Sequence, residues 1–132
     1  MEIELRAALI GWLRAAPTPL DMLNAIEEEA PPRAAPPWLG IAASASADWG
    51  TKDRPGREVR VAVELTTRGD DPAADGALVR ALGARIEALP RLHPDFEIAS
   101  ILFLRARAER RERNLRSVLL EYRFRLLSPQ PE

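Results

Sequence analysis

The strongest constraint on the fold is an alternating stretch at residues 57–68. Its odd-numbered positions from 59 to 65 are apolar and most of its even-numbered positions are polar; the apolar set is Val59, Val61, Val63 and Leu65. Neighbouring side chains of a β-strand point to opposite faces, so this pattern predicts a strand with one face on a core and one face towards water. The β-branched residues favour the same assignment.

A second alternating stretch lies near the end of the sequence. Its apolar positions are Val118, Leu120, Tyr122, Phe124 and Leu126, and its polar positions are Ser117, Glu121, Arg123 and Arg125. Two strands that are each apolar on one face need a covering layer. The segment 72–89 is predicted to be a helix that supplies it, with Asp71 as N-cap, Pro72 at the first position and Pro90 beyond the end. Its apolar stripe is Leu78, Leu82, Ile86 and Leu89.

The N-terminal part of the chain predicts two helices. Residues 2–16 carry an apolar stripe at spacings of three and four, made of Leu5, Leu9, Trp12 and Leu13, and Pro17 ends it. Thr18 and Pro19 have the character of an N-cap followed by a first helical position, so a short second helix is expected with Leu20, Leu23 and the 25–26 pair packed inward.

The remaining segments alternate between loops and strands. Four prolines in residues 30–37 predict an extended connector. A first strand is expected at 38–47, whose small residues at 42–47 indicate close packing or an edge position. A loop follows at 48–56. A third strand is expected at 96–107, with either a β-bulge near Ser100 or burial of 101–104 on both faces. A charged connector at 108–114 makes a hairpin with the last strand.

These elements predict an α+β fold of order α-α-β-β-α-β-β. We expect about four strands in a mainly antiparallel sheet, covered by two main helices. A length of 132 residues with 46% hydrophobic content suits a single domain over 1–132. Residues 1–37 are its N-terminal helices and proline-rich lead, and 128–132 are predicted to form a frayed tail.

The residues argue against catalysis and metal binding. His93 is the only histidine and there is no cysteine, so a metal site would need carboxylates alone. A solvated loop histidine is the expectation, and no serine stands in a nucleophile-elbow context. The acidic run at 27–29 is read as solvated surface, because adjacent helical residues do not share a face. The prediction is a protein that is not an enzyme and has no cofactor.

Charge and hydropathy argue against polyanions and membranes as partners. The net charge of −1 gives no support to general polyanion binding. No apolar run approaches the roughly 20 residues needed to span a bilayer, and the acidic N-terminus is unlike a secretory signal. We therefore expect a soluble protein made in the cytosol, with no membrane partner.

The candidate interface residues gather in two places. Arginines crowd the expected tip of the last hairpin, at Arg105, Arg107, Arg110, Arg111 and Arg113. They form either a positive projection towards DNA or an acidic partner, or a charged turn that keeps an edge hairpin soluble. The loop 48–56 adds Trp49, Lys52 and Arg54. Trp49 either caps the core of its own domain or anchors in a neighbouring subunit.

Taken in order, these features resemble the small tail-completion, or tail-terminator, proteins of long-tailed bacteriophages and phage-like gene transfer agents. The resemblance rests on the N-terminal helix, the lead into 37–41, the loop 48–51, the strand 57–65, the helix 78–82 and the closing strand through 122–125. It covers nearly the whole chain as a pattern of element order and residue character, without an invariant catalytic motif.

The resemblance implies a structural protein of a virion or phage-like particle, assembled in the host cytoplasm. It implies a ring, commonly a hexamer, that caps the tail tube and joins the tail to head-closure proteins. DNA would then be a partner only in transit through the lumen. The alternatives are a head-closure (stopper) or connector protein of the neck, and, more distantly, a small α+β ligand-binding domain. The acidic N-terminal segments, with Glu2, Glu4, Asp21 and 27–29, are hypothesised to meet the basic hairpin of a neighbour.

Overall fold

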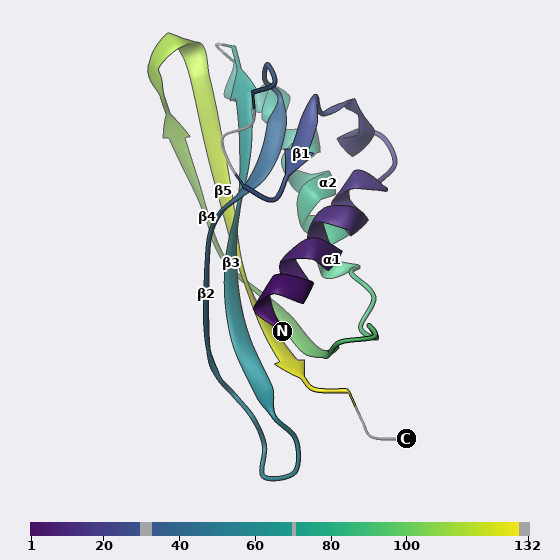
Figure 1. The fold of residues 1–132 in the computed structure, drawn as a ribbon. Helices are drawn as coiled ribbons and strands as arrows, with labels where there is room; N and C mark the ends of the chain where they lie inside the picture. The colour runs from purple at the N-terminus through teal and green to yellow at the C-terminus, as the bar shows by residue number, and fades with distance from the viewer. Residues whose placement is uncertain (30–32, 70, 130–132) are drawn as a thin grey trace.

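The computed structural model describes residues 1–29, 33–69 and 71–129, and shows a long twisted sheet with two helices against one face (Figure 1). The helices are α1 (Glu2–Arg14) and α2 (Gly76–Glu87), and the strands are β1 (Ala25–Glu27), β2 (Trp38–Asp48), β3 (Gly56–Arg68), β4 (Glu97–Arg110) and β5 (Leu115–Leu127). Three short 3₁₀ turns complete it: η1 (Leu20–Met22), η2 (Pro72–Asp75) and η3 (Glu112–Asn114). No helix in the described ranges is long and apolar enough to cross a bilayer.

The sheet has the strand order β1-β2-β3-β5-β4. The four long strands pair with one another in antiparallel orientation. Strands β3 and β5 pair without interruption from Gly56 opposite Leu127 to Arg68 opposite Leu115. The α+β class and the mainly antiparallel sheet are confirmed. The number of strands was wrong, because β1 adds a short fifth strand that runs parallel to β2.

The predicted second helix is also wrong. The helical part of this segment is the single 3₁₀ turn η1, and Ala25 and Ile26 lie in β1. The side-chain amide of Asn24 donates to the carbonyls of Ala35 and Pro36, at 2.9 and 3.1 Å, and the Asn24 N–H donates to Pro37 O at 2.8 Å. These bonds hold the segment extended beside the start of β2. They come from residues more than ten positions away, which local helix signals do not report.

The second major helix begins as predicted. The Asp71 carboxylate accepts a hydrogen bond from the Ala73 N–H at 3.0 Å, and Pro72 occupies the first position of η2, which leads directly into α2. Leu82 and Ile86 are fully buried. The cap and the proline therefore start a continuous helical segment whose first turn is 3₁₀ in form.

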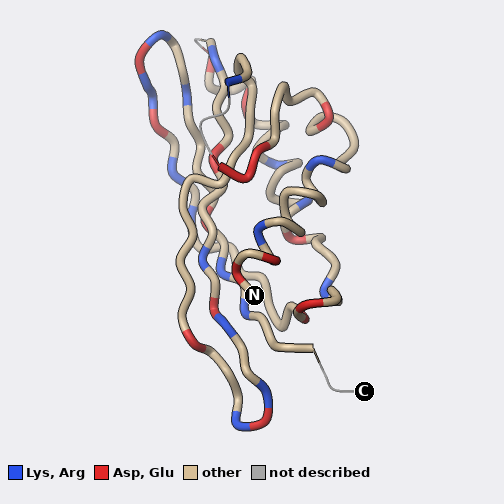
Figure 2. Tube along the Cα trace, viewed as in Figure 1, with Lys and Arg blue, Asp and Glu red and all other residues tan. Residues whose placement is uncertain are grey.

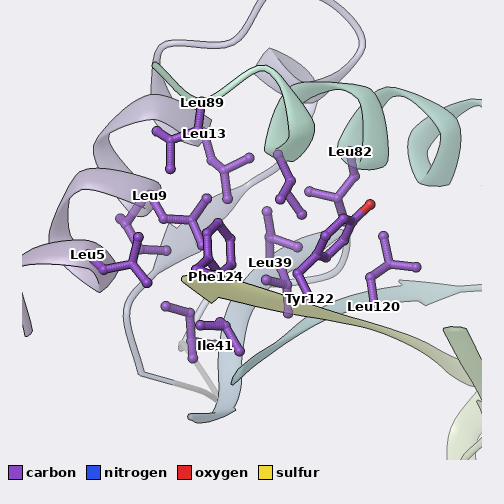
Figure 3. Close-up of a cluster of buried hydrophobic side chains, with 14 of the residues drawn as sticks. Leu5, Leu9, Leu13, Leu39, Ile41, Leu82, Leu89, Leu120, Tyr122 and Phe124 are labelled. Carbon is purple, nitrogen blue, oxygen red and sulfur yellow. The ribbon is translucent and has the colours of Figure 1, made fainter. Parts of the chain in front are cut away.

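The core lies between the helices and one face of the sheet (Figure 3). All four apolar residues predicted for the inner face of β3 are at most 1% exposed. Helix α1 contributes Leu5, Leu9 and Leu13, each fully buried, and β5 contributes Leu120, Tyr122 and Phe124. Burying one such large side chain stabilises the fold by about 1.5–3 kcal/mol. The predicted inner faces of β3 and β5 are confirmed, but the prediction that their polar residues face water is wrong in part, because Glu64, Thr66 and Ser117 are buried as well.

Trp12 and Arg85 join the two helices. The Trp12 indole N–H donates to Arg85 O at 2.7 Å, and the Arg85 guanidinium donates to Trp12 O at 2.7 Å. The same guanidinium lies 3.4 Å from the centroid of the Trp12 ring, a cation–π contact. These reciprocal bonds hold α1 directly against α2, in addition to the contacts that each helix makes with the sheet.

Strand β4 is the irregular edge of the sheet. Register shifts occur between Ile98 and Ser100 and between Phe103 and Arg105, so the predicted bulge near Ser100 is confirmed and a second one accompanies it. The alternative of burial on both faces at 101–104 is wrong, since Leu102 is 44% and Phe103 45% exposed. The reason is position: among the described strands β5 alone flanks β4, so the side chains of β4 have fewer neighbours.

One predicted strand differs in extent, and two other predicted segments lie partly or mostly outside the described residues. The strand expected at 96–107 continues to Arg110, and the turn of the hairpin is η3. The proline-rich connector at 30–37 lies partly outside the described residues, and 33–37 form no strand. The predicted fraying at 128–132 lies mostly outside them.

Candidate assembly interfaces

The two hairpins of the sheet project at opposite ends of the molecule (Figure 1). The β2–β3 hairpin ends in the loop 49–55, and the β4–β5 hairpin ends in η3. Both reach beyond the part of the sheet that the helices cover. The predicted interface residues are therefore divided between two separate sites.

At the first site the loop is bound to its own sheet. Trp49 is half-buried, and the Arg125 guanidinium lies 5.3 Å from its ring centroid. Arg54 donates to Glu97 at 2.9 Å and to Ser128 O at 3.2 Å, and its side chain is only 18% exposed. Lys52 is exposed and makes no ion pair with a described residue. Trp49 and Arg54 thus contact their own domain, and Lys52 remains available at the tip.

At the second site most of the arginines are paired within the chain. Arg105 donates two hydrogen bonds to Glu121, at 2.7 and 3.1 Å, which raises the pKa of Arg105 and lowers the pKa of Glu121. Arg107 lies 3.3 Å from Glu109. Arg111 lies 2.7 Å from Glu64, whose carboxylate also accepts from the Ser117 hydroxyl at 2.6 Å.

Basic and acidic positions follow one another around this tip (Figure 2). Two of its arginines remain exposed, Arg110 and Arg113. Neither makes an ion pair with a residue in the described ranges. The Arg113 backbone has φ 60°, in the left-handed region, because it lies in the tight turn of the hairpin. The acidic partners Glu64 and Glu121 were not predicted. Their outward positions on alternating strands were visible, but only the strand order places them beside these arginines.

The face of the sheet away from the helices carries paired charges. Glu58 on β3 lies 3.2 Å from Arg125 and 3.8 Å from Arg123 on β5. Some of the N-terminal acids are paired too: Glu27 lies 3.0 Å from Arg14 and Glu28 3.7 Å from Arg6. Such surface pairs contribute little stability, about 0–1 kcal/mol each. They neutralise Glu58, Glu27 and Glu28 within the chain.

A hollow lies between α2 and the projecting β4–β5 hairpin. It has a volume of about 490 Å³ and includes Pro72, Val79, Ala108 and Val118. Asp75 and Arg116 line it as a bidentate ion pair with bonds of 3.0 and 2.9 Å, and Arg116 also donates to Gly69 O. This pair is satisfied within the chain, whereas Arg80 and Arg110, which also line the hollow, make no ion pair with a described residue.

The rest of the described chain holds no catalytic arrangement that we can identify. His93 stacks on Phe96 with ring centroids 4.4 Å apart, and its Nε2–H donates to Pro90 O at 2.6 Å. No group of three or more His, Asp or Glu side chains among the described residues is placed to hold a metal ion. His93 therefore has a structural role in its loop.

The two outer edges of the sheet are unlike each other. β1 covers only Trp38, Leu39 and Gly40 of β2, and no described strand lies beside the rest of β2. At the other side of the sheet, no described strand flanks the outer edge of β4. A free sheet edge offers unpaired N–H and C=O groups to another chain.

Comparisons with known proteins agree with this architecture. The family model described as tail completion protein gp17 matches residues 7–127. The search of curated proteins found no match. Among solved structures, a chain of the virion of a native gene transfer agent particle has a TM-score of 0.72 at 24% identity, over 94% of this chain and 95% of that one. That likeness shows that the two chains share a fold.

The family match spans almost every element described above, from α1 to the last residue of β5. A tail completion protein is a structural component of a virion tail. The predicted family and the predicted location in a phage-like particle are thereby confirmed. The chain belongs to the tail completion protein gp17 family, a family of structural virion proteins.

Proposed function

We propose that the whole chain acts as one domain that assembles into a ring, a hexamer, at the head-proximal end of a phage-like tail tube. The ring stops growth of the tube and joins the tail to the head-closure proteins. The family supplies the tail-completion role. The observation that carries the ring is the pair of unlike, unpaired edges on opposite sides of one sheet.

Unlike edges favour a ring over a two-fold dimer. In a two-fold dimer the same patch of each copy meets itself, whereas a ring uses two different patches that meet head to tail. The edge of β2 and the edge of β4 differ in residue size and charge. Each copy therefore offers two different surfaces, which is what a closed ring requires.

The exposed cations Lys52, Arg110 and Arg113 lie at the two ends of the sheet. We assign them to contacts with the proteins above and below the ring, or with acidic residues of a neighbouring copy. The paired charges on the helix-free face suit a lumen through which DNA passes without sequence-specific binding, because paired arginines hold phosphate weakly.

Light scattering and negative-stain microscopy test this function on the purified chain at high concentration, alone and with tail tubes. The expected result is a ring of uniform size that binds tube ends. A strict monomer that forms no rings and does not bind tubes would overturn the proposal in favour of a small ligand-binding domain. A ring that binds the portal-side ring and ignores tubes would instead indicate a stopper or connector.

A further inference from the structure

The free part of the β2 edge lacks the usual protection against strand pairing. Beyond Gly40, β2 continues to Asp48 with no described strand on its outer side. Residues 42–47 are all alanine or serine, and only Asp48 at the end is charged. Monomeric proteins usually guard such an edge with lysine, proline or inward charges. A bulge between Ile41 and Ala43 precedes the run and leaves 43–48 regular.

The β4 edge has a matching unprotected run. Between its two bulges, residues 100–103 pair regularly with β5. This run exposes Leu102 and Phe103, at 44% and 45%, although both are large apolar side chains. Apart from Glu97 at its first position, the charged residues of β4 lie after the second bulge, from Arg105 onward.

The register carried across the sheet places the two runs at the same level. Leu102 lies opposite Arg123, Arg123 opposite Arg60, and Arg60 opposite Ala45. The register also places the C-terminal half of β4, which carries the arginines. Ala108 in that half is level with Leu39, where β1 already pairs with the edge of β2. Leu102 and Phe103 on one edge thus lie level with Ala45 and Ser44 on the other. Arg105 lies level with Ala43, and the charged residues from Arg107 onward lie level with the part of β2 that β1 covers, or beyond it.

Strand direction decides how the two edges meet. Three successive antiparallel pairings make β4 run opposite to β2. In a ring whose symmetry axis runs parallel to the strands, the rotation from one copy to the next does not change the strand directions. Strand β4 of one copy therefore meets β2 of the next in antiparallel orientation. We propose that residues 100–103 of one copy pair with residues 43–48 of the next and join the sheets around the ring.

This inference rests on the proposed ring and names its interface. Because side chains alternate along a strand, Leu102 shares the helix-free face with Ala43, Ala45 and Ala47. Ser44 lies on the opposite face. Antiparallel partners on one face have Cβ atoms about 4.5–5.5 Å apart, and the closer, non-hydrogen-bonded pairs reach the upper limit of about 4.5 Å for a disulfide. Closure of the ring adds a stagger along the strands, which selects one of the three alanines.

Cysteine pairs test the interface, since the chain has no cysteine of its own. Leu102→Cys is combined in turn with Ala43→Cys, Ala45→Cys and Ala47→Cys, all at exposed positions. After mild oxidation with copper phenanthroline, at least one pair is expected to give a ladder of covalent oligomers that ends at the ring. The matched control, Leu102→Cys with Ser44→Cys, is expected to give about ten times less product because its side chains point to opposite faces.

The outcomes separate this inference from the proposed function. Rings in which no same-face pair exceeds the control would overturn the edge pairing and leave the ring standing. No rings and no ladder would overturn the ring, and this interface with it. Covalent dimers from Ala45→Cys alone would show that β2 pairs with β2 of another copy, which also overturns the proposal. Thermal melting of each variant confirms that it has folded.

Discussion

Gly11 and Gly83 both lie inside helices, yet only Gly11 has room for a side chain. A methyl group built at Gly11 of α1 meets no atom within 4 Å, whereas one at Gly83 of α2 lies 3.2 Å from the Tyr122 hydroxyl. Glycine inside a helix costs about 0.5–1 kcal/mol relative to alanine. The spacing of residues along a helix does not reveal which glycine is needed for close packing.

Gly11→Ala should therefore raise the free energy of unfolding by about 0.5–1 kcal/mol. Gly83→Ala should gain less, because the new methyl group presses on a hydroxyl whose ring is held in the core. Urea unfolding of the two variants beside the parent chain measures both changes. An equal gain at both positions would mean that Tyr122 shifts without cost.

Tyr122 makes the stability sensitive to alkaline pH. Burial, and secondarily the negative charge of Glu87, raise the pKa of Tyr122 to about 12. Because the folded pKa is raised above the unfolded value, the stabilising contribution is fully present below about pH 10 and is lost as pH rises towards 12. The free energy of unfolding should fall by up to about 2–3 kcal/mol across that window.

Denaturant unfolding at a series of pH values from 9 upward, about one unit apart, checks this loss. Tyr122→Phe is the control, since it should remove the downward slope. Tyr122 is the only tyrosine, so the absorbance of tyrosinate reports this group alone. An absorbance transition near the ordinary value of about 10 in the folded protein would contradict the prediction.

At the scale of elements, one ion pair holds the start of α2 to the sheet. Arg116 on β5 bonds both oxygens of Asp75 at the N-terminal end of the helix, and the two side chains are 12% and 10% exposed. Removing one partner of a nearly buried pair leaves an uncompensated charge. Arg116→Met should therefore destabilise the fold by about 2–4 kcal/mol.

A double-mutant cycle separates the pair from its surroundings. The variant Arg116→Met/Asp75→Asn should lose less than the sum of the two single changes, since neither charge is left alone. Thermal or urea unfolding of the four proteins gives the coupling energy. Strictly additive losses would show that the two side chains act independently.

The β4–β5 hairpin tip tests the proposed partner contacts. Arg110→Glu/Arg113→Glu reverses the two exposed arginines that make no ion pair with a described residue, and should weaken ring formation or tube binding by about tenfold. The matched control, Arg33→Glu/Arg80→Glu, makes the same charge change at other exposed positions. Sedimentation at physiological salt compares them. An unchanged oligomer in the tip variant would remove this tip from the interface.

For the whole molecule, the prediction concerns which neighbour the ring meets. Immobilised ring should retain tail tubes made of the major tail protein and should bind the head-closure protein on its other side. The two sites at opposite ends of the sheet provide one surface for each. A Lys52→Glu variant that loses one partner and keeps the other would support this division. Equal loss of both would show that the two ends do not act separately.

The sequence by itself determined the faces and limits of the main elements. The alternation at 57–68 and 117–126 identified the apolar inner faces of β3 and β5, and Asp71, Pro72 and Pro90 delimited the second major helix. The alternation did not identify the buried polar residues Glu64, Thr66 and Ser117. These features are local: they depend on side-chain period and on backbone preferences at capping positions, and both can be read from neighbouring residues.

Only the tertiary structure decided which strands are neighbours, and therefore which charged side chains form ion pairs with one another. The parallel strand β1 forms through bonds from Asn24 to residues far along the chain, and Arg111 is neutralised by Glu64 from a separate hairpin. Pairing between distant strands costs chain entropy that no local pattern encodes. For the same physical reason, the two open edges became visible only once the strand order was known.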